Sequence, residues 1–151
     1  MKIFIATDHR GVDIQKEIIN HLTEKNIEVI ESTLPHNDTD DYVDFAIDVS
    51  KSVVANPGSM GILICGTGIG MSIAANKVKG IRAANCHSVM DAYHTRNDND
   101  SNILCLGYNQ NLYELYDIID MFISTNFSNE ERHIRRVNKI TKYESGEVNE
   151  L

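Results

Sequence analysis

Short apolar runs alternate along the chain with longer segments in which apolar residues recur every three or four positions. The runs are brief and almost uninterrupted, which is typical of strands in a parallel sheet that is covered on both faces. They lie at residues 3–6, 27–30, 62–65, 82–85 and 103–106. The pattern therefore predicts a set of β-strands separated by segments of a different kind.

The intervening segments carry their apolar residues on one helical face. The stripes are Ile14, Ile18 and Leu22, then Tyr42, Phe45, Val49 and Val53, and later Leu112, Leu115, Ile119 and Phe122. Alternating strands and helices predict an α/β protein, a three-layer α/β/α Rossmann-like fold around a five-stranded parallel sheet. We expect a polar loop over residues 35–41, and an extra C-terminal helix over residues 129–143 that is available to pack on another subunit.

The composition narrows the classes of partner. The 151 residues suit one domain, residues 1–151, with a formal net charge of -8 and a pI near 5.1. An acidic chain lacks the basic face that binding to nucleic acid requires. Because no run approaches the roughly 20 apolar residues of a membrane span and the first residues do not form a signal peptide, we expect no membrane partner and a cytoplasmic location.

The cysteines offer no evidence of a disulfide or a metal centre. Cys65, Cys86 and Cys105 are odd in number and share no CxxC spacing, so reduced thiols are expected. The histidines and cysteines form no cluster with the spacing of zinc ligands. The sequence therefore predicts no metal.

The segment GILICGTGIGMS combines a thiol with a glycine-rich loop. An apolar strand ends in Cys65, and Gly66, Gly68 and Gly70 follow before a helix expected over about residues 71–78. Alternating glycines let successive backbone N–H groups converge on one oxygen, and the first amides of the helix add to the same attraction for negative charge. The spacing matches neither the dinucleotide fingerprint nor the P-loop. This loop predicts a site for a phosphate or an oxyanion beside a potential base.

Other polar residues are expected near the carboxyl ends of the strands, where parallel α/β sheets bind their ligands. Asp8 and His9 follow the first strand. Arg132 and Arg136 lie four residues apart on the predicted last helix, so both guanidinium groups can point the same way and suit a phosphate.

Several of these motifs together resemble those of a known family, the type B ribose-5-phosphate isomerases with the related galactose-6-phosphate isomerases. The matching pieces are Thr7-Asp8-His9, Asp41-Tyr42, the block 61–77, Gly80-Ile81-Arg82-Ala83-Ala84, Asn99-Asp100 followed by Asn102, and Arg132-His133 with Arg136-Val137. The resemblance covers almost the whole chain in the family's order. It implies a dimer or tetramer with shared active sites, interconversion of an aldose phosphate with its ketose, and no metal or organic cofactor.

The resemblance also implies a role for each matched residue. Cys65 would move a proton between C1 and C2, and Thr67 would assist proton transfer between the sugar oxygens. The loop from Gly66 through Gly68 to Gly70 would hold the enediolate. Asp8 and Tyr42 would contact the sugar, and Asn99 would reach in from the neighbouring subunit. His9, Arg132 and Arg136 would hold the phosphate. A cysteine base and fixed N–H donors are also what proton removal beside a carbonyl needs.

The chain departs from the family's pattern at two positions. Asp98 stands where the family usually has the histidine assigned to ring opening, and Asn109 lies where many members have a phosphate-binding arginine shortly after the fifth strand. An ordinary carboxylate is ionised near pH 7, so Asp98 is suited to act as a base rather than an acid. His94, one helical turn earlier, is a candidate stand-in.

Structural interpretations remain open for several of these residues. Cys65 alone at a strand end reads as a packed thiol, as do Cys86 and Cys105, and Asp8 with His9 reads as a helix cap. Arg132 and Arg136 also fit a solvated basic face. The run Asp38, Asp40 and Asp41 is interpreted as a solvated turn rather than a calcium site.

The sequence therefore predicts an isomerase of D-ribose 5-phosphate and D-ribulose 5-phosphate that works through an enediolate with a cysteine base. One alternative is an isomerase of another sugar phosphate, such as a six-carbon aldose 6-phosphate. Another is a non-catalytic subunit that binds a sugar phosphate. A phosphoacceptor receiver domain is disfavoured, because Cys65 and Gly107 occupy the strand ends where it needs Asp and Lys.

Overall fold

All the predicted strands form, and they pair in parallel into one sheet. The computed structural model describes residues 1–147. The strands are β1 (Lys2–Thr7), β2 (Glu28–Glu31), β3 (Met60–Cys65), β4 (Ala83–Asn85) and β5 (Ile103–Gly107). They form a 5-stranded sheet in the order β2-β1-β3-β5-β4, with every pair parallel. Because β2 and β3 lie on opposite sides of β1, the topological switch point falls between β1 and β3.

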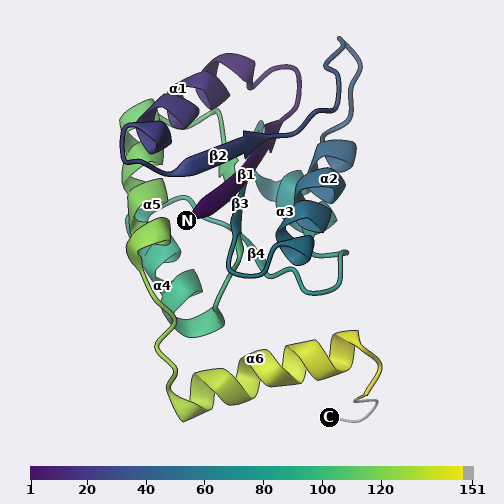
Figure 1. The fold of residues 1–151 in the computed structure, drawn as a ribbon, viewed down its shortest axis with the longest axis vertical. Coiled ribbons are helices and arrows are strands. Elements are labelled where there is room, and N and C mark those ends of the chain that lie inside the picture. The colour runs from purple at the N-terminus through teal and green to yellow at the C-terminus, as the bar shows by residue number, and fades with distance from the viewer. Residues whose placement is uncertain (148–151) are drawn as a thin grey trace.

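Helices cover both faces of this sheet, as predicted (Figure 1). The helices are α1 (Val12–Thr23), α2 (Tyr42–Ala55), α3 (Ile69–Ala75), α4 (Val89–Asn99), α5 (Leu112–Ser124) and α6 (Glu131–Glu144). The helices α1, α4 and α5 pack on one face, and α2 with α3 packs on the other. The three-layer α/β/α arrangement is therefore confirmed.

Alternation along each strand divides the core between the two layers. In β3, Ile62 and Ile64 pack toward α1 and α5, whereas Leu63 and Cys65 pack toward α2 and α3. All four side chains are buried. The thiol of Cys65 therefore lies in the same layer as the helix that follows it.

The extra C-terminal helix is also confirmed, and α6 lies apart from the two layers (Figure 1). Its buried contact is His133, whose neighbours are on the end of α4 and in the segment before α6. Ile134, Ile140 and Tyr143 on the same helix are exposed by 38%, 51% and 67%. Within residues 1–147, no helix has both the length and the apolar character that crossing a membrane requires.

The boundaries of α3 differ from those expected. The helix begins at Ile69 and ends at Ala75, rather than covering residues 71–78. Asn76 explains the early end, because its side-chain amide donates to the carbonyl of Ala83 and accepts from the Ala83 N–H, each at 2.9 Å. These hydrogen bonds turn the chain into β4 before another helical turn can form.

Candidate active site

The carboxyl edge of the sheet gathers the first group of predicted residues. Thr7 pairs with Ile64 across β1 and β3, and Cys65 pairs with Gly107 across β3 and β5. The segments that follow these strands therefore begin side by side at the switch point, which is where α/β sheets bind ligands. Asp8 lies in this region.

Cys65 is held at the mouth of the sheet by its own loop. Its residue exposure is 5%, and its Sγ accepts a hydrogen bond from the Gly68 N–H at 3.2 Å. This contact fixes the position of the sulfur at the start of the loop. Gly68 has φ of +81°, and a side chain there would lie 3.0 Å from the backbone of Leu106 and closer still to the Asn85 amide. Only glycine fits this position.

The rest of the loop is fixed by its neighbours. With its amide oriented to satisfy both partners, Asn85 donates to the carbonyls of Thr67 and Cys105, each at 3.2 Å, and accepts from His87 Nε2. The Thr67 hydroxyl accepts from the Ile69 N–H at 3.2 Å and remains at the exposed side of the loop. The loop is therefore preorganised by the edge strand β4.

The backbone N–H groups of the predicted anion-binding loop differ in what they contact. The Gly68 N–H is directed at sulfur, so it is not free for an anion. Within residues 1–147, the backbone N–H groups of Gly66 and Gly70 have no hydrogen-bond acceptor. These two donors remain available to a developing oxyanion.

Tyr42 was assigned to the apolar stripe of its helix, but its side chain is exposed by 38%. The ring lies on Gly70, because a Cβ atom at position 70 would be 2.6 Å from Tyr42 Cζ and 2.8 Å from its hydroxyl oxygen. Tyr42 therefore covers the start of α3 instead of joining the core. This placement brings its phenol to the candidate anion site.

Sequence reasoning missed Tyr108 and Arg10 as members of this site. The Tyr108 N–H donates to the Cys65 carbonyl at 3.0 Å, and its hydroxyl lies 3.7 Å from where a side chain on Gly66 would begin. Burial raises the pKa of Tyr108, the Asp8 carboxylate raises it further, and the Arg10 guanidinium opposes both. The position of Tyr108 directly after the fifth strand is the feature of the sequence that could have identified it.

His9 is tied to the loop before α2 by Asp40. Its Nδ1 lies 2.7 Å from Asp40 Oδ1, and its backbone N–H donates to the same oxygen at 3.0 Å. The other oxygen, Oδ2, lies 2.8 Å from His36 Nδ1. The Asp40 side chain is only 5% exposed, so the expectation of a solvated turn is wrong for this residue. Both imidazole rings provide the pairing that a buried carboxylate requires.

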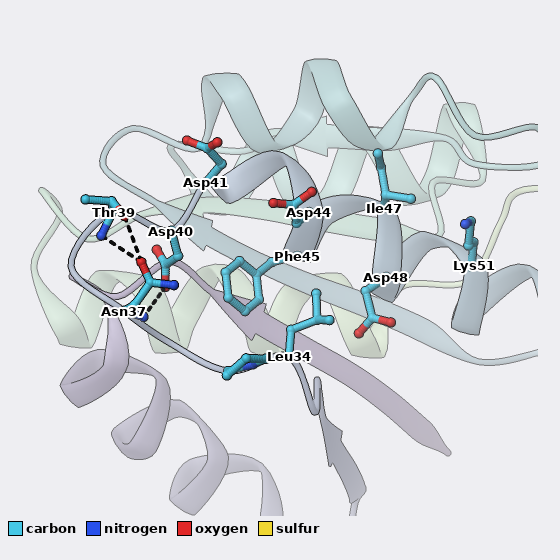
Figure 2. Close-up of a pocket in the computed structure, with 11 residues that line it drawn as sticks. Leu34, Asn37, Thr39, Asp40, Asp41, Asp44, Phe45, Ile47, Asp48 and Lys51 are labelled. Atoms are coloured by element: carbon cyan, nitrogen blue, oxygen red, sulfur yellow. Dashed lines mark hydrogen bonds between the residues drawn. The ribbon is translucent and has the colours of Figure 1, made fainter.

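A groove of about 540 Å³ lies beside this loop, against α2 (Figure 2). Figure 2 shows Asp41 and Asp44 along it, with Asp48 and Lys51 further along the helix. Because its carboxylates outnumber the single lysine, the groove repels a phosphate. Within residues 1–147, no three His, Cys, Asp or Glu side chains converge in a way that would hold a metal ion.

The second group of predicted residues lies elsewhere. Asp98 and Asn99 are at the end of α4, and α4 leads into the start of β5. They are therefore near the amino edge, roughly 15 Å from Cys65, which is the length of a five-residue strand. Arg132 and Arg136 lie on α6, beyond this edge (Figure 1). One protomer does not bring these residues to the thiol.

Asp98 lies between two histidines. A hydrogen bond from Asn97 lowers the pKa of Asp98, partial burial opposes this, and the rings of His133 and His94 lower the pKa further. Asp98 Oδ2 is 3.4 Å from His94 Nδ1, and Oδ1 is 3.8 Å from His133 Nε2. The carboxylate is therefore ionised at neutral pH and cannot donate a proton there.

The two arginines of α6 differ in their surroundings. Arg132 forms an ion pair with Glu130. Arg136 is exposed and has no carboxylate within 4.0 Å among residues 1–147. Asn99 lines a hollow of about 440 Å³ together with Ile140 of α6. The helix thus presents cations and apolar side chains beside the end of α4.

Comparison with known proteins agrees with this architecture. Residues 3–140 match the family described as Ribose/Galactose Isomerase. The ribose-5-phosphate isomerase B of Mycobacterium tuberculosis is 36% identical over 146 residues, which cover 95% of this chain and 90% of that protein.

Solved structures of similar proteins superpose closely. Ribose-5-phosphate isomerase B of Clostridium thermocellum has a TM-score of 0.91 at 42% identity, covering 98% of this chain and 100% of that one. The enzyme of the same name from Mycoplasma genitalium, solved with bound ribulose-5-phosphate, has a TM-score of 0.90 at 41% identity, covering 95% and 96%.

Proposed function

Because this chain belongs to the ribose/galactose isomerase family, we propose that it interconverts D-ribose 5-phosphate and D-ribulose 5-phosphate. The observation that carries the proposal is the buried thiol of Cys65 next to a loop whose Gly66 and Gly70 N–H groups have no acceptor in the described part of the chain. An aldose–ketose isomerase needs a base at carbon and fixed donors at oxygen, and this loop offers both.

In the proposed reaction, the Cys65 thiolate removes the proton from C2 of the open-chain aldose. The electron pair moves to form the C1–C2 double bond, and the carbonyl oxygen at C1 becomes an oxyanion that faces the N–H groups of Gly66 and Gly70. The hydroxyl of Thr67 passes the proton of O2 to O1. The Cys65 thiol then returns its proton to C1, which leaves a ketone at C2 and regenerates the thiolate.

Substrate binding is assigned to the residues around this loop. Asp8 and Tyr42 contact the sugar hydroxyls, and Tyr42 is held in place by its packing on Gly70. His9 binds the phosphate from the end of β1. The acidic groove beside α2 is not part of this assignment.

A second copy of the chain completes the proposed site. Asn99, Arg132 and Arg136 lie too far from Cys65 to act within one protomer, yet they are exposed together near the end of α4. A partner placed with its α6 against the carboxyl edge brings the arginines to the phosphate and Asn99 to the sugar. The proposal therefore requires a homodimer, or a homotetramer made from such dimers.

Asp98 enters the same site from the partner and acts on the closed ring. An ionised carboxylate accepts the proton of the anomeric hydroxyl, which starts ring opening. This role differs from that of an acid, and it follows from the low pKa that Asn97 and the neighbouring histidines impose.

Proton exchange in heavy water tests the proposed function directly. The protein is incubated with D-ribose 5-phosphate in D₂O, and the sugar is analysed by NMR. We expect ketose formation with deuterium at C1 and C2 of the sugars. A protein that binds the sugar phosphate without incorporating deuterium would instead be a non-catalytic binding subunit.

An isomerase of a six-carbon aldose 6-phosphate is the second candidate, because Asp98 and Asn109 depart from the pattern for ribose 5-phosphate. The same assay with five- and six-carbon aldose phosphates separates the candidates. A higher kcat/KM for the hexose phosphate would assign the chain to the longer sugar.

A further inference from the structure

Asp40 forms a bridge between two histidines that belong to different parts of the chain. His9 is 31 residues away in the sequence, and both its backbone N–H and its Nδ1 bind Asp40 Oδ1. His36 Nδ1 and the Asn37 N–H contact Oδ2, at 2.8 Å and 3.4 Å. Figure 2 shows the contact between Asn37 and Asp40 at the tip of the loop. Both carboxylate oxygens are therefore satisfied.

His36 is fixed against the core, and the Asp40 carboxylate that it contacts is ionised. The His36 ring stacks on Phe45 with centroids 4.8 Å apart, and Phe45 is a core residue with 2% exposure. Burial opposes ionisation of Asp40, but the hydrogen bonds from His9, His36 and the backbone prevail and lower its pKa to about 2. A carboxylate fixed by a core-anchored ring is a rigid partner for His9.

This arrangement decides which atom of His9 faces outward. An ionised carboxylate accepts hydrogen bonds only, so the Nδ1 beside it must carry a hydrogen. The Nε2 atom lies on the opposite side of the ring and has no hydrogen-bond partner within residues 1–147. If Nε2 also donates to an anion, both ring nitrogens carry hydrogens and the ring is an imidazolium.

We propose that Asp40 is a positioning residue for phosphate binding, which holds His9 so that a protonated Nε2 donates to the phosphate. The proposal rests on the assignment of His9 to the phosphate in the proposed function. It also supplies a cation near the site in a chain that has Asn109 where an arginine was expected. His36 supports Asp40 from behind and does not touch the ligand.

Nitrogen NMR of the histidine rings tests the central geometry in the wild-type protein. The rings are recorded with and without inorganic phosphate, and His9 is identified from the spectrum of His9→Asn. We expect a hydrogen on Nδ1 in the free protein and hydrogens on both nitrogens when phosphate is bound. A neutral His9 ring in the bound state would overturn the proposal, whatever happens in the variants.

The variant Asp40→Asn keeps the shape and one acceptor oxygen but removes the charge. We expect inorganic phosphate to bind about tenfold more weakly and KM for D-ribose 5-phosphate to rise by a similar factor, because the hydrogen bond loses its charged partner. The kcat value should change by less than about twofold, since the thiol and its loop are untouched. The NMR signal of a His9 ring that carries hydrogens on both nitrogens should disappear.

Asp38→Asn is the matched control, because Asp38 is exposed on the same loop and loses the same charge. It should leave phosphate affinity and the His9 signal unchanged. Equal weakening in both variants would place the effect in the loop as a whole rather than in the contact between Asp40 and His9, and it would overturn the proposal. Phosphate titration and ring spectra require no turnover, so a wild-type protein without isomerase activity would refute the proposed function while this test still gives its answer.

Discussion

The ring of Tyr42 occupies the space that a side chain at position 70 would need. A Cβ atom on Gly70 would lie 2.6 Å from Tyr42 Cζ, well inside van der Waals contact. The first residue of α2 and the first turn of α3 are thereby packed face to face. Glycine at this position keeps the phenol and the Gly70 N–H on the same small surface.

Gly70→Ala should therefore reduce activity by displacing Tyr42. We expect kcat/KM for D-ribose 5-phosphate to fall by about tenfold or more, the equivalent of one lost hydrogen bond to the transition state. Steady-state kinetics measures this. Gly58→Ala is the control: Gly58 has φ of +86°, but none of residues 1–147 comes within 4 Å of the added methyl group, so stability should fall while kcat/KM is preserved.

Cys65→Ala should abolish proton transfer. Removing a base at carbon costs roughly 10²–10⁴ in rate, and both isomerisation and deuterium uptake should fall by such a factor while inorganic phosphate still binds. Cys86→Ala provides the comparison, because burial raises the pKa of Cys86 to about 12 and the residue faces the other layer. Retained exchange in the Cys65 variant would remove the thiol from the mechanism.

Asp98→Asn should separate ring opening from enediolate formation. The amide cannot accept the anomeric proton, so the initial rate on D-ribose 5-phosphate should fall by about 10²-fold. D-ribulose 5-phosphate has no furanose ring, and exchange of its C1 proton in D₂O should continue at nearly the wild-type rate. Parallel loss of both rates would show that Asp98 acts on the enediolate or on folding.

Mixing two inactive variants tests whether the site is shared between subunits. Cys65→Ala lacks the proposed base, and the double variant Arg132→Ala with Arg136→Ala lacks the two arginines proposed to bind the phosphate. After unfolding and refolding together, half of the dimers should contain one of each chain and one intact site, which restores about a quarter of wild-type activity. If each site were built from a single chain, every site in the mixture would stay defective.

The hydrogen bonds of Asp40 with His9 and His36 predict that the free energy of unfolding decreases at low pH, through the titration of Asp40. Its pKa is lowered to about 2 from an ordinary value of 3.8, so its contribution is complete above the ordinary value and is lost as the pH falls toward 2. By linkage, this difference in pKa corresponds to a contribution on the order of 1–2 kcal/mol. Urea unfolding of the wild type and Asp40→Asn should differ at pH 6 and converge as the pH falls from about 4 to 2.

Most of the fold could be predicted because each strand and helix is encoded locally. The brief apolar runs and the helical stripes depend on residues within a few positions of one another, and the strands and their covering helices formed where these patterns lie. The differences arose where distant residues compete with local pattern. Asn76 ends α3 by bonding to Ala83, and Tyr42 leaves its stripe to cover Gly70.

The candidate site could be predicted only in part. The placement of Asp8 and Cys65 at one edge follows from the rule for parallel strands. The role of Asp40 depends on a loop that folds back across 31 residues to His9, and no local pattern announces that contact. Likewise, a linear sequence does not reveal that Asp98 and Arg136 lie beyond the opposite edge of the sheet.

The packing of the loop between β3 and α3 against its neighbouring strands limits which residues can change when substrate preference changes. Gly68 is confined by the backbone of β5, and Thr67 is fastened to Asn85 on the edge strand. Insertions or larger residues here would disrupt the loop that carries the proposed base, together with the strand packing. We therefore expect a change of sugar to come from exchange of the surrounding side chains, such as Tyr42 and Tyr108, with the backbone of the loop unchanged.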